Sequence, residues 1–220
     1  HWIELWYLLK LTSVETLVLT EINCKDKLDD IFSFVRRQND LGSLSLQRCS
    51  FDSRAFTAKL VASKKLCEAL TSLNVSDNRL GSNDAKHLAG ALQNLKIKKL
   101  DISDNRLCEL YSDCSSTYNG AGIEALSEAL KRNTSLKTLS MSKTYVGPKG
   151  AKVLADGLSA NGALASLDVR SNLLTGTVPA SLGSLSALTS LNLRSNSLTG
   201  TVPASLGSLS ALTSLNLRSN

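Results

Sequence analysis

The stretch Leu174–Asn196 reads LTGTVPASLGSLSALTSLNLRSN, and the same letters return without a substitution as Leu198–Asn220. Such a return is a tandem duplication. Self-similarity with a period of about 20–50 residues is the sequence signature of a solenoid, in which each unit packs only against its neighbours. The segment LTSLNLRSN that ends each copy has the spacing L-x-x-L-x-L-x-x-N. The duplication therefore predicts a stack of similar units, each with one short strand.

The same spacing recurs toward the N-terminus, with some substitutions by other apolar residues, Cys or Thr. Eight units begin at Val14, Leu41, Leu70, Ile97, Leu136, Leu164, Leu188 and Leu212. In a strand, alternate side chains point to opposite faces. The second and third apolar residues of each unit are therefore predicted to be buried, and the residue between them exposed. This pattern predicts a sheet of eight strands.

The segments between the strands change character along the chain. Three pairs of leucines lie four residues apart, which predicts helices in the earlier units: Leu88 and Leu92, Leu126 and Leu130, Leu154 and Leu158. From Leu174 onward, Gly and Pro would break a long helix, so a short extended piece and a turn of 3₁₀ helix are expected. Residues 1–12 have apolar residues at helical spacing and predict a further amphipathic helix.

An asparagine follows the strand in most units. Its side chain can donate to and accept from backbone groups of the turn, which stacking would otherwise bury without partners. We expect a ladder of such residues through the solenoid: Asn78, Asn105, Asn172 and Asn196. Thr144 stands at this position in one unit and can satisfy fewer groups, so the ladder should be weakest there. Cys49 occupies the same position and is expected to be structural.

The units between residues 14 and 172 combine a strand with a full helix. The phrases Gly150–Ala155 (GAKVLA) and Leu167–Asn172 (LDVRSN) resemble the ribonuclease-inhibitor type of leucine-rich repeat. Residues 174–220 resemble the plant-specific type, with the pattern LTGxxPxxLGxL. These resemblances imply an α/β leucine-rich repeat solenoid, curved, with parallel strands on the concave face. Helices, and then short extended or 3₁₀ segments, would form the convex face.

The resemblance implies a single solenoid over residues 1–220, which we expect to be part of a longer protein. Residues 1–173 form its ribonuclease-inhibitor-like region, and residues 174–220 form the two identical units. An interval of 39 residues between two of the unit starts contains an insertion, about 108–118. Long loops in repeat arrays often carry function, but a tolerated surface insertion is an equal alternative.

Composition narrows the function classes. The net charge is +6 and no apolar run is long enough to span a bilayer. Aromatic residues interleaved with Lys and Arg, which would stack on bases, are absent from the sequence, so neither nucleic-acid binding nor membrane insertion is predicted. Five cysteines at irregular spacing are typical of reduced thiols and a cytoplasmic protein, with an extracellular location as the alternative. Cys108 and Cys114 share a short segment, and whether they are bridged stays open.

Motifs of catalysis and metal binding are also missing. The sequence has no Gly-x-Ser-x-Gly elbow, no phosphate-binding Gly-x-x-x-x-Gly-Lys-Ser/Thr loop and no Cys-x-x-Cys pair. Its one internal histidine, His87, is expected to be solvated on a helix. We therefore predict that the protein is not an enzyme and has no catalytic residue, no cofactor and no metal site.

The exposed face of the strands is the candidate binding surface. It is predicted to be acidic near Asp77, Asp101 and Asp104, and basic along Arg170, Arg194 and Arg218, with Asn192 and Asn216 beside the last two. Arginines repeated on successive strands can bind carboxylates with two hydrogen bonds each. The alternative is that duplication merely copied one surface arginine.

These features predict a non-enzymatic scaffold for protein–protein interaction. Its partner would be another protein, with an acidic surface, in a larger complex. Two other functions stay open: the ligand-recognition region of an immune-type or surface receptor, and a small-GTPase regulator. The last is implied by resemblance alone, because one family of activating proteins uses ribonuclease-inhibitor-type repeats.

Overall fold

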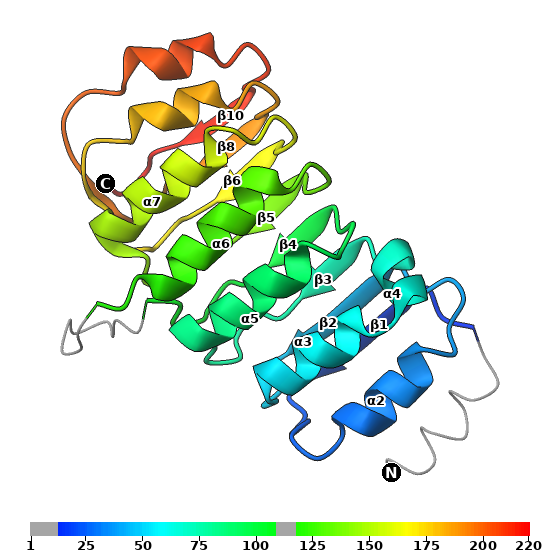
Figure 1. Cartoon of the computed structure of the whole chain (residues 1–220). Coiled ribbons are helices and arrows are strands. Elements are labelled where there is room, and N and C mark those ends of the chain that lie inside the picture. Colours follow the sequence, from blue (N-terminus) through cyan, green and yellow to red (C-terminus); the bar gives the residue numbers. More distant parts are fainter. Residues whose placement is uncertain (1–12, 109–117) are drawn as a thin grey trace.

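The computed structural model describes residues 13–108 and 118–220. The predicted helix over residues 1–12 and most of the insertion about 108–118 lie outside these ranges. The described residues form a layer of parallel strands covered on one side by helices (Figure 1). Strand and helix therefore alternate along the chain, and the predicted α/β solenoid is confirmed.

Eight strands pair in the order in which they follow along the chain. They are β1 (Thr16–Thr20), β2 (Ser43–Gln47), β3 (Ser72–Asn74), β4 (Lys99–Asp101), β5 (Thr138–Ser140), β6 (Ser166–Asp168), β8 (Ser190–Asn192) and β10 (Ser214–Asn216). The register aligns equivalent leucines, such as Leu100 with Leu139 and Leu139 with Leu167. Because a one-residue slip would turn every side chain to the other face, this register fixes which side chains are buried.

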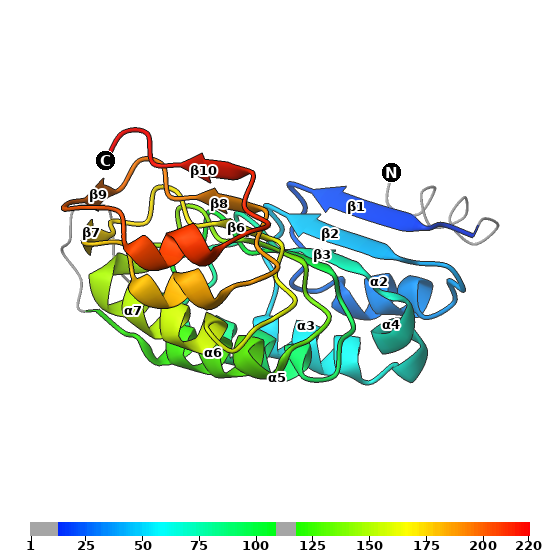
Figure 2. The same ribbon diagram turned by 90° about the horizontal axis from the view of Figure 1, so that it is seen from above.

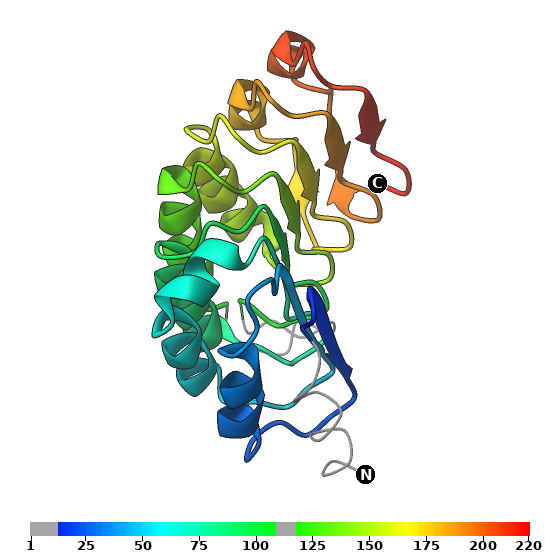
Figure 3. The ribbon, with the colours of Figure 1, turned by 90° about the vertical axis from the view of Figure 1, so that its right-hand side faces the viewer.

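The convex side carries helices over most of its length. They are α2 (Leu28–Val35), α3 (Ser53–Val61), α4 (Lys64–Ala69), α5 (Ser82–Leu92), α6 (Ala121–Arg132) and α7 (Gly147–Leu158). All three predicted leucine pairs are buried in α5, α6 and α7. Figure 2 shows these helices on one side of the strands, and Figure 3 shows the sheet on the inner side of the arc. Helices pack about 8–10 Å apart and strands about 4.8 Å apart, so the helical side must be the outer one.

The convex side changes where the duplicated units begin. Two 3₁₀ helices replace the α-helices, η1 (Ala180–Ser184) and η2 (Ala204–Ser208), and each begins directly after a proline, Pro179 or Pro203. The predicted break is thus confirmed. Two short strands, β7 (Thr175–Gly176) and β9 (Ser197–Leu198), pair in a second, parallel sheet that the sequence did not predict. Because the two units have the same sequence, their extended segments have the same backbone conformation and lie in register, so they can pair.

The core is continuous along the stack. The strand leucines and the helix leucines pack in one cluster that runs from Leu17 to Leu209. Small residues let neighbouring helices approach: a Cβ atom placed on Gly157 of α7 would lie 1.9 Å from the Ser127 Oγ of α6. Close packing of each unit on the next is what a solenoid requires, since no unit buries its apolar face alone.

Three cysteines are thiols buried in this core, Cys24, Cys49 and Cys67. The Cys49 thiol donates to the backbone carbonyls of Leu19 and Gln47, both at 3.3 Å, and so takes part of the role of an asparagine amide. Its hydrogen bond with Cys24, together with burial, raises the pKa of the Cys24 thiol. Cys108 is buried as well. Cys114 lies outside the described residues, so its pairing with Cys108 stays untested.

Candidate functional site

The candidate site is the concave face. Its first column consists of the exposed or half-buried residues at the centre of the strands, one per strand and in register: Val18, Ser45, Asn74, Asp101, Ser140, Asp168, Asn192 and Asn216. Five of these residues also shape the backbone that follows. For example, the side-chain oxygens of Asp168 and Asn192 accept hydrogen bonds from the backbone N–H groups of Arg170 and Arg194 at 3.1 and 3.2 Å. In these five units the column residue thus positions the residue two places after it, beyond the end of the strand.

A second recurring feature is a left-handed residue before the ladder position. The φ angle is positive at Glu21, Arg48, Asp77, Asp104, Lys143, Ser171, Ser195 and Ser219. Non-glycine residues rarely adopt this conformation, and each one costs free energy. In most units the turn is retained because the side chain of the next residue hydrogen-bonds to it. This feature was not predicted from the sequence, since none of these positions is a glycine.

The ladder asparagines supply that tie. The Asn172 amide nitrogen donates to three backbone carbonyls, those of Met141, Val169 and Arg170 at 2.8, 2.9 and 3.2 Å. Its Oδ1 accepts from the backbone N–H groups of Thr144 and Val146 at 2.9 and 3.3 Å. Asn78, Asn105 and Asn196 make equivalent bonds that join their own unit to the preceding one. Thr144 Oγ1 lies 2.8 Å from the Met141 carbonyl of its own turn and 3.0 Å from Asn172 Oδ1 of the next unit, but it bonds no backbone group of the preceding unit in the described part of the chain.

The acidic part of the concave face is largely neutralised. Arg48 pairs with both Glu21 and Asp77, at 2.8 and 2.6 Å, and these carboxylates raise the pKa of its guanidinium. Lys143 pairs with Asp104 at 3.2 Å. Two of the three predicted acidic residues, Asp77 and Asp104, therefore each have a basic partner within the solenoid, and their role in binding stays a prediction. Asp101 makes no ion pair with any described residue, but its Oδ1 accepts from Ser103 N at 2.9 Å.

The basic part of the concave face is less neutralised by ion pairs than the acidic part. Arg170, Arg194 and Arg218 are exposed and follow successive strands, and the Arg194 and Arg218 carbonyls each accept a hydrogen bond from the preceding unit, at 3.0 and 2.9 Å. Arg170 lies 3.5 Å from the carboxylate of Asp168. Asn192 and Asn216 take the place of that aspartate in the next two units, so Arg194 and Arg218 make no ion pair within the described part of the chain. We call these three residues the arginine column.

His87 is not solvated as expected. It is half-buried, and its Nδ1 lies 3.3 Å from the Ser53 Oγ, which also donates to Asp84. This group is not a catalytic triad, because the carboxylate bonds the serine instead of orienting the imidazole. The second oxygen of Asp84 accepts from Gly81 N at 2.7 Å at the start of α5. The three residues therefore tie α3 to α5.

Residues 13–108 and 118–220 contain no cluster of three or more His, Cys, Asp or Glu side chains placed to hold a metal ion. None of their helices has the length and hydropathy needed to cross a bilayer.

Comparison with known proteins gives matches over much of the chain. A family model described as "Leucine rich repeat" matches residues 163–220, and a second of the same description matches residues 67–89 and 132–155. The crystal structure of a TLR13–ssRNA13 complex is similar with a TM-score of 0.62 and 21% identity, over 96% of this chain and 26% of that one.

The ectodomain of the Arabidopsis receptor kinase HAESA, solved with an N-terminally extended IDA peptide hormone, gives a TM-score of 0.43 and 23% identity. That match covers 70% of this chain and 23% of the other. This chain therefore spans about a quarter of the length of each structure. At these identities the TLR13 likeness establishes the fold alone.

Proposed function

We propose that this chain, which is a leucine-rich repeat protein, is a non-enzymatic binding module whose concave face holds an acidic protein partner in a larger complex. The observation that carries the proposal is the pair Arg194 and Arg218. Both are exposed, both follow successive strands, and neither makes an ion pair within the described residues.

The energetics of the arginine column favour a partner. Unit charges about 5 Å apart repel by about 1 kcal/mol in water, and neighbouring asparagines do not offset this repulsion. The isolated solenoid thus gains no stability from the column. A carboxylate-rich surface lying across the strands would pair with the guanidinium groups, each of which can form two parallel hydrogen bonds.

We propose three finer assignments as well. Residues 14–172 are repeats of the ribonuclease-inhibitor type, supported by the full helices α5, α6 and α7. Residues 174–220 are repeats of the plant-specific type, supported by the 3₁₀ helices and the second sheet. A cytoplasmic location is the third assignment, supported by the buried thiols Cys24, Cys49 and Cys67.

Charge reversal tests the proposed function. The double variant Arg194→Glu/Arg218→Glu should weaken binding of a fluorescent oligoglutamate peptide at least about tenfold, because each charged contact is worth about 1.5–3 kcal/mol. Its binding should also lose salt dependence. Fluorescence anisotropy at several ionic strengths measures both effects.

The matched control is Lys149→Glu/Lys152→Glu, which changes the net charge equally but lies on the exposed side of α7. It should change the affinity less than about twofold, since distant exposed charges are screened. If both variants weaken binding equally, the peptide responds to total charge and the arginine column has no binding role.

A further inference from the structure

A hollow of about 630 Å³ opens between the C-terminal ends of α5 and α6. It lies at the edge of the solenoid where helices end and strands begin, opposite the edge that bears the arginine column. Three cations line it, Lys96, Lys98 and Arg132, and beside them stand polar residues of the loop after α6: Asn133, Thr134 and Ser135. We call this site the basic hollow.

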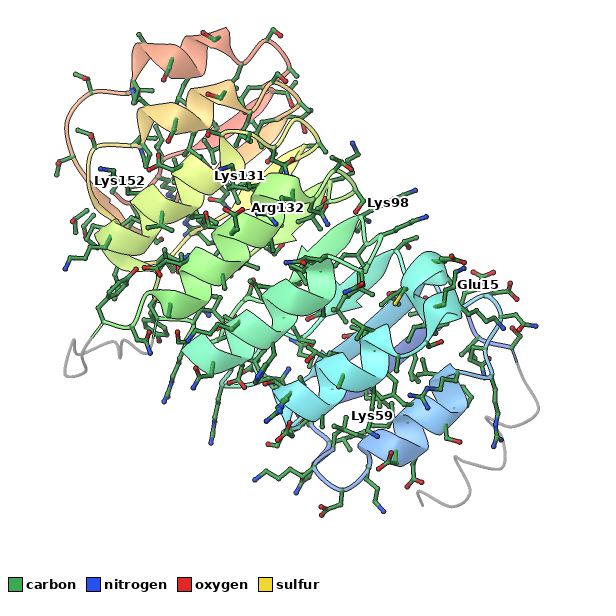
Figure 4. The ribbon with its side chains drawn as sticks, in the orientation of Figure 1. Glu15, Lys59, Lys98, Lys131, Arg132 and Lys152 are labelled. Carbon is green, nitrogen blue, oxygen red and sulfur yellow. The ribbon has the colours of Figure 1, made fainter. Side chains whose placement is uncertain are left out.

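Positive charge is concentrated around the basic hollow. Segments 93–99 and 128–137 contain six exposed cations, Lys96, Lys98, Lys99, Lys131, Arg132 and Lys137. Glu128 is their only carboxylate, so the two segments have a net charge of +5, whereas the entire chain has +6. Figure 4 shows Lys98, Lys131 and Arg132 toward the same end of the helix layer, with Lys152 toward the opposite end.

The fold itself accounts for only part of this charge. Lys131 and Arg132 lie in the last turn of α6, where cations offset the negative end of the helix dipole. That effect falls off within the last turn, and α5 ends at Leu92. Lys96, Lys98 and Lys99 lie beyond it, and Lys137 lies beyond the end of α6. A helix dipole therefore does not explain these four lysines.

Ion pairs do not explain the cluster either. Arg132 lies 2.7 Å from Glu128, but both side chains are more than half exposed, and such a pair contributes only about 0.3–0.5 kcal/mol. A ligand phosphate could therefore replace Glu128 at little cost. None of the five lysines makes an ion pair with a described residue. In the preceding unit, α4 contains one carboxylate, Glu68, and Lys64 and Lys65 outnumber it.

We propose that the basic hollow binds a ligand that carries clustered phosphate groups, either free or as the headgroup of a lipid. Lysine binds phosphate as a point charge, and the hollow falls within the range of about 300–1,000 Å³ that is usual for small-ligand sites. Segments 93–99 and 128–137 contain no aromatic residue, so a platform for stacking nucleobases is missing. The ligand is recognised by its phosphates, independently of the partner on the concave face.

Titration with inorganic tripolyphosphate is the direct test. The wild-type chain should bind it, and Lys96→Gln/Lys98→Gln/Arg132→Gln should weaken binding at least about tenfold, the effect of losing one charged contact or more. The control Lys25→Gln/Lys27→Gln/Lys152→Gln removes the same charge away from the hollow and should change affinity less than about twofold. Lys96→Arg/Lys98→Arg keeps the charge and should bind nearly as the wild type does, which excludes misfolding as the cause of a loss.

Vesicles distinguish the two sources of phosphate. Sedimentation with phosphatidylcholine vesicles that contain some phosphatidylinositol bisphosphate, blocked by free tripolyphosphate, would support a lipid headgroup. Binding of tripolyphosphate without binding of these vesicles would support a free ligand. If neither probe binds, or if the control variant loses as much affinity as the hollow variant, the proposal is overturned.

Discussion

Replacing Leu139 with Ala should lower the free energy of unfolding by about 2–5 kcal/mol. Leu139 is fully buried in β5, near the middle of the sheet, and pairs in register with Leu100 and Leu167. Truncation removes its contacts with two units at once. The neighbouring units are already held by their own pairing, so they can collapse only partly into the space. Urea denaturation measures the loss as a lower midpoint with an unchanged slope.

The control is its neighbour Ser140, which faces the concave side and is half-buried. Ser140→Ala should cost less than about 0.5 kcal/mol, because its side chain makes no hydrogen bond to a described residue. Similar losses in both variants would show that the buried and exposed faces of the strands have been assigned wrongly.

Asn172→Ala should cost about 3 kcal/mol or more, although asparagine is polar and alanine is not. The change removes the acceptor of two backbone N–H groups, those of Thr144 and Val146, in a site from which water is excluded, and the Met141, Val169 and Arg170 carbonyls each lose one of their donors. Each unsatisfied buried group costs about 1–3 kcal/mol, and relaxation of the turn can recover only some of this. Thermal and urea unfolding both report the loss.

Asn192→Ala is the matched control for this prediction. Asn192 is an asparagine one unit further along, but it lies in the concave column and its Oδ1 accepts only from Arg194 N, at 3.2 Å. It should cost less than about 1 kcal/mol, since water can replace one exposed hydrogen bond. An equal loss in the two variants would mean that the ladder position has no special role.

Much of the backbone could be predicted from the sequence because the same apolar spacing recurs in eight units. Spacing alone placed Leu139 inside and Ser140 outside, and Pro179 and Pro203 marked where α-helices give way to 3₁₀ helices. These features depend on the period of apolar residues and on proline, both of which are local properties of the chain.

Side-chain partnerships were less predictable. Arg48 and Asp77 lie 29 positions apart and meet only because adjacent strands bring their turns together. The contact of His87 with Ser53 likewise joins two helices of different units, so a helical histidine gave no sign of it. The basic hollow was missed for the same reason: Lys98 and Arg132 are distant in sequence and line one space only after α5 and α6 pack. The sequence shows that Asn192 and Asn216 occupy the position that Asp168 occupies in its own unit. Only the structure shows the consequence, which is that Arg194 and Arg218 lack the ion pair that Arg170 makes.

Arginine-specific labelling tests the central claim most directly. Phenylglyoxal modifies exposed guanidinium groups, and mass spectrometry reads the rate at each residue with and without a saturating oligoglutamate peptide. If the concave face is the binding surface, the peptide should slow labelling of Arg170, Arg194 and Arg218 severalfold and leave the exposed Arg36 and Arg54 of the helical side unchanged. Equal protection of all five arginines, or protection of Arg36 and Arg54 alone, would contradict the account.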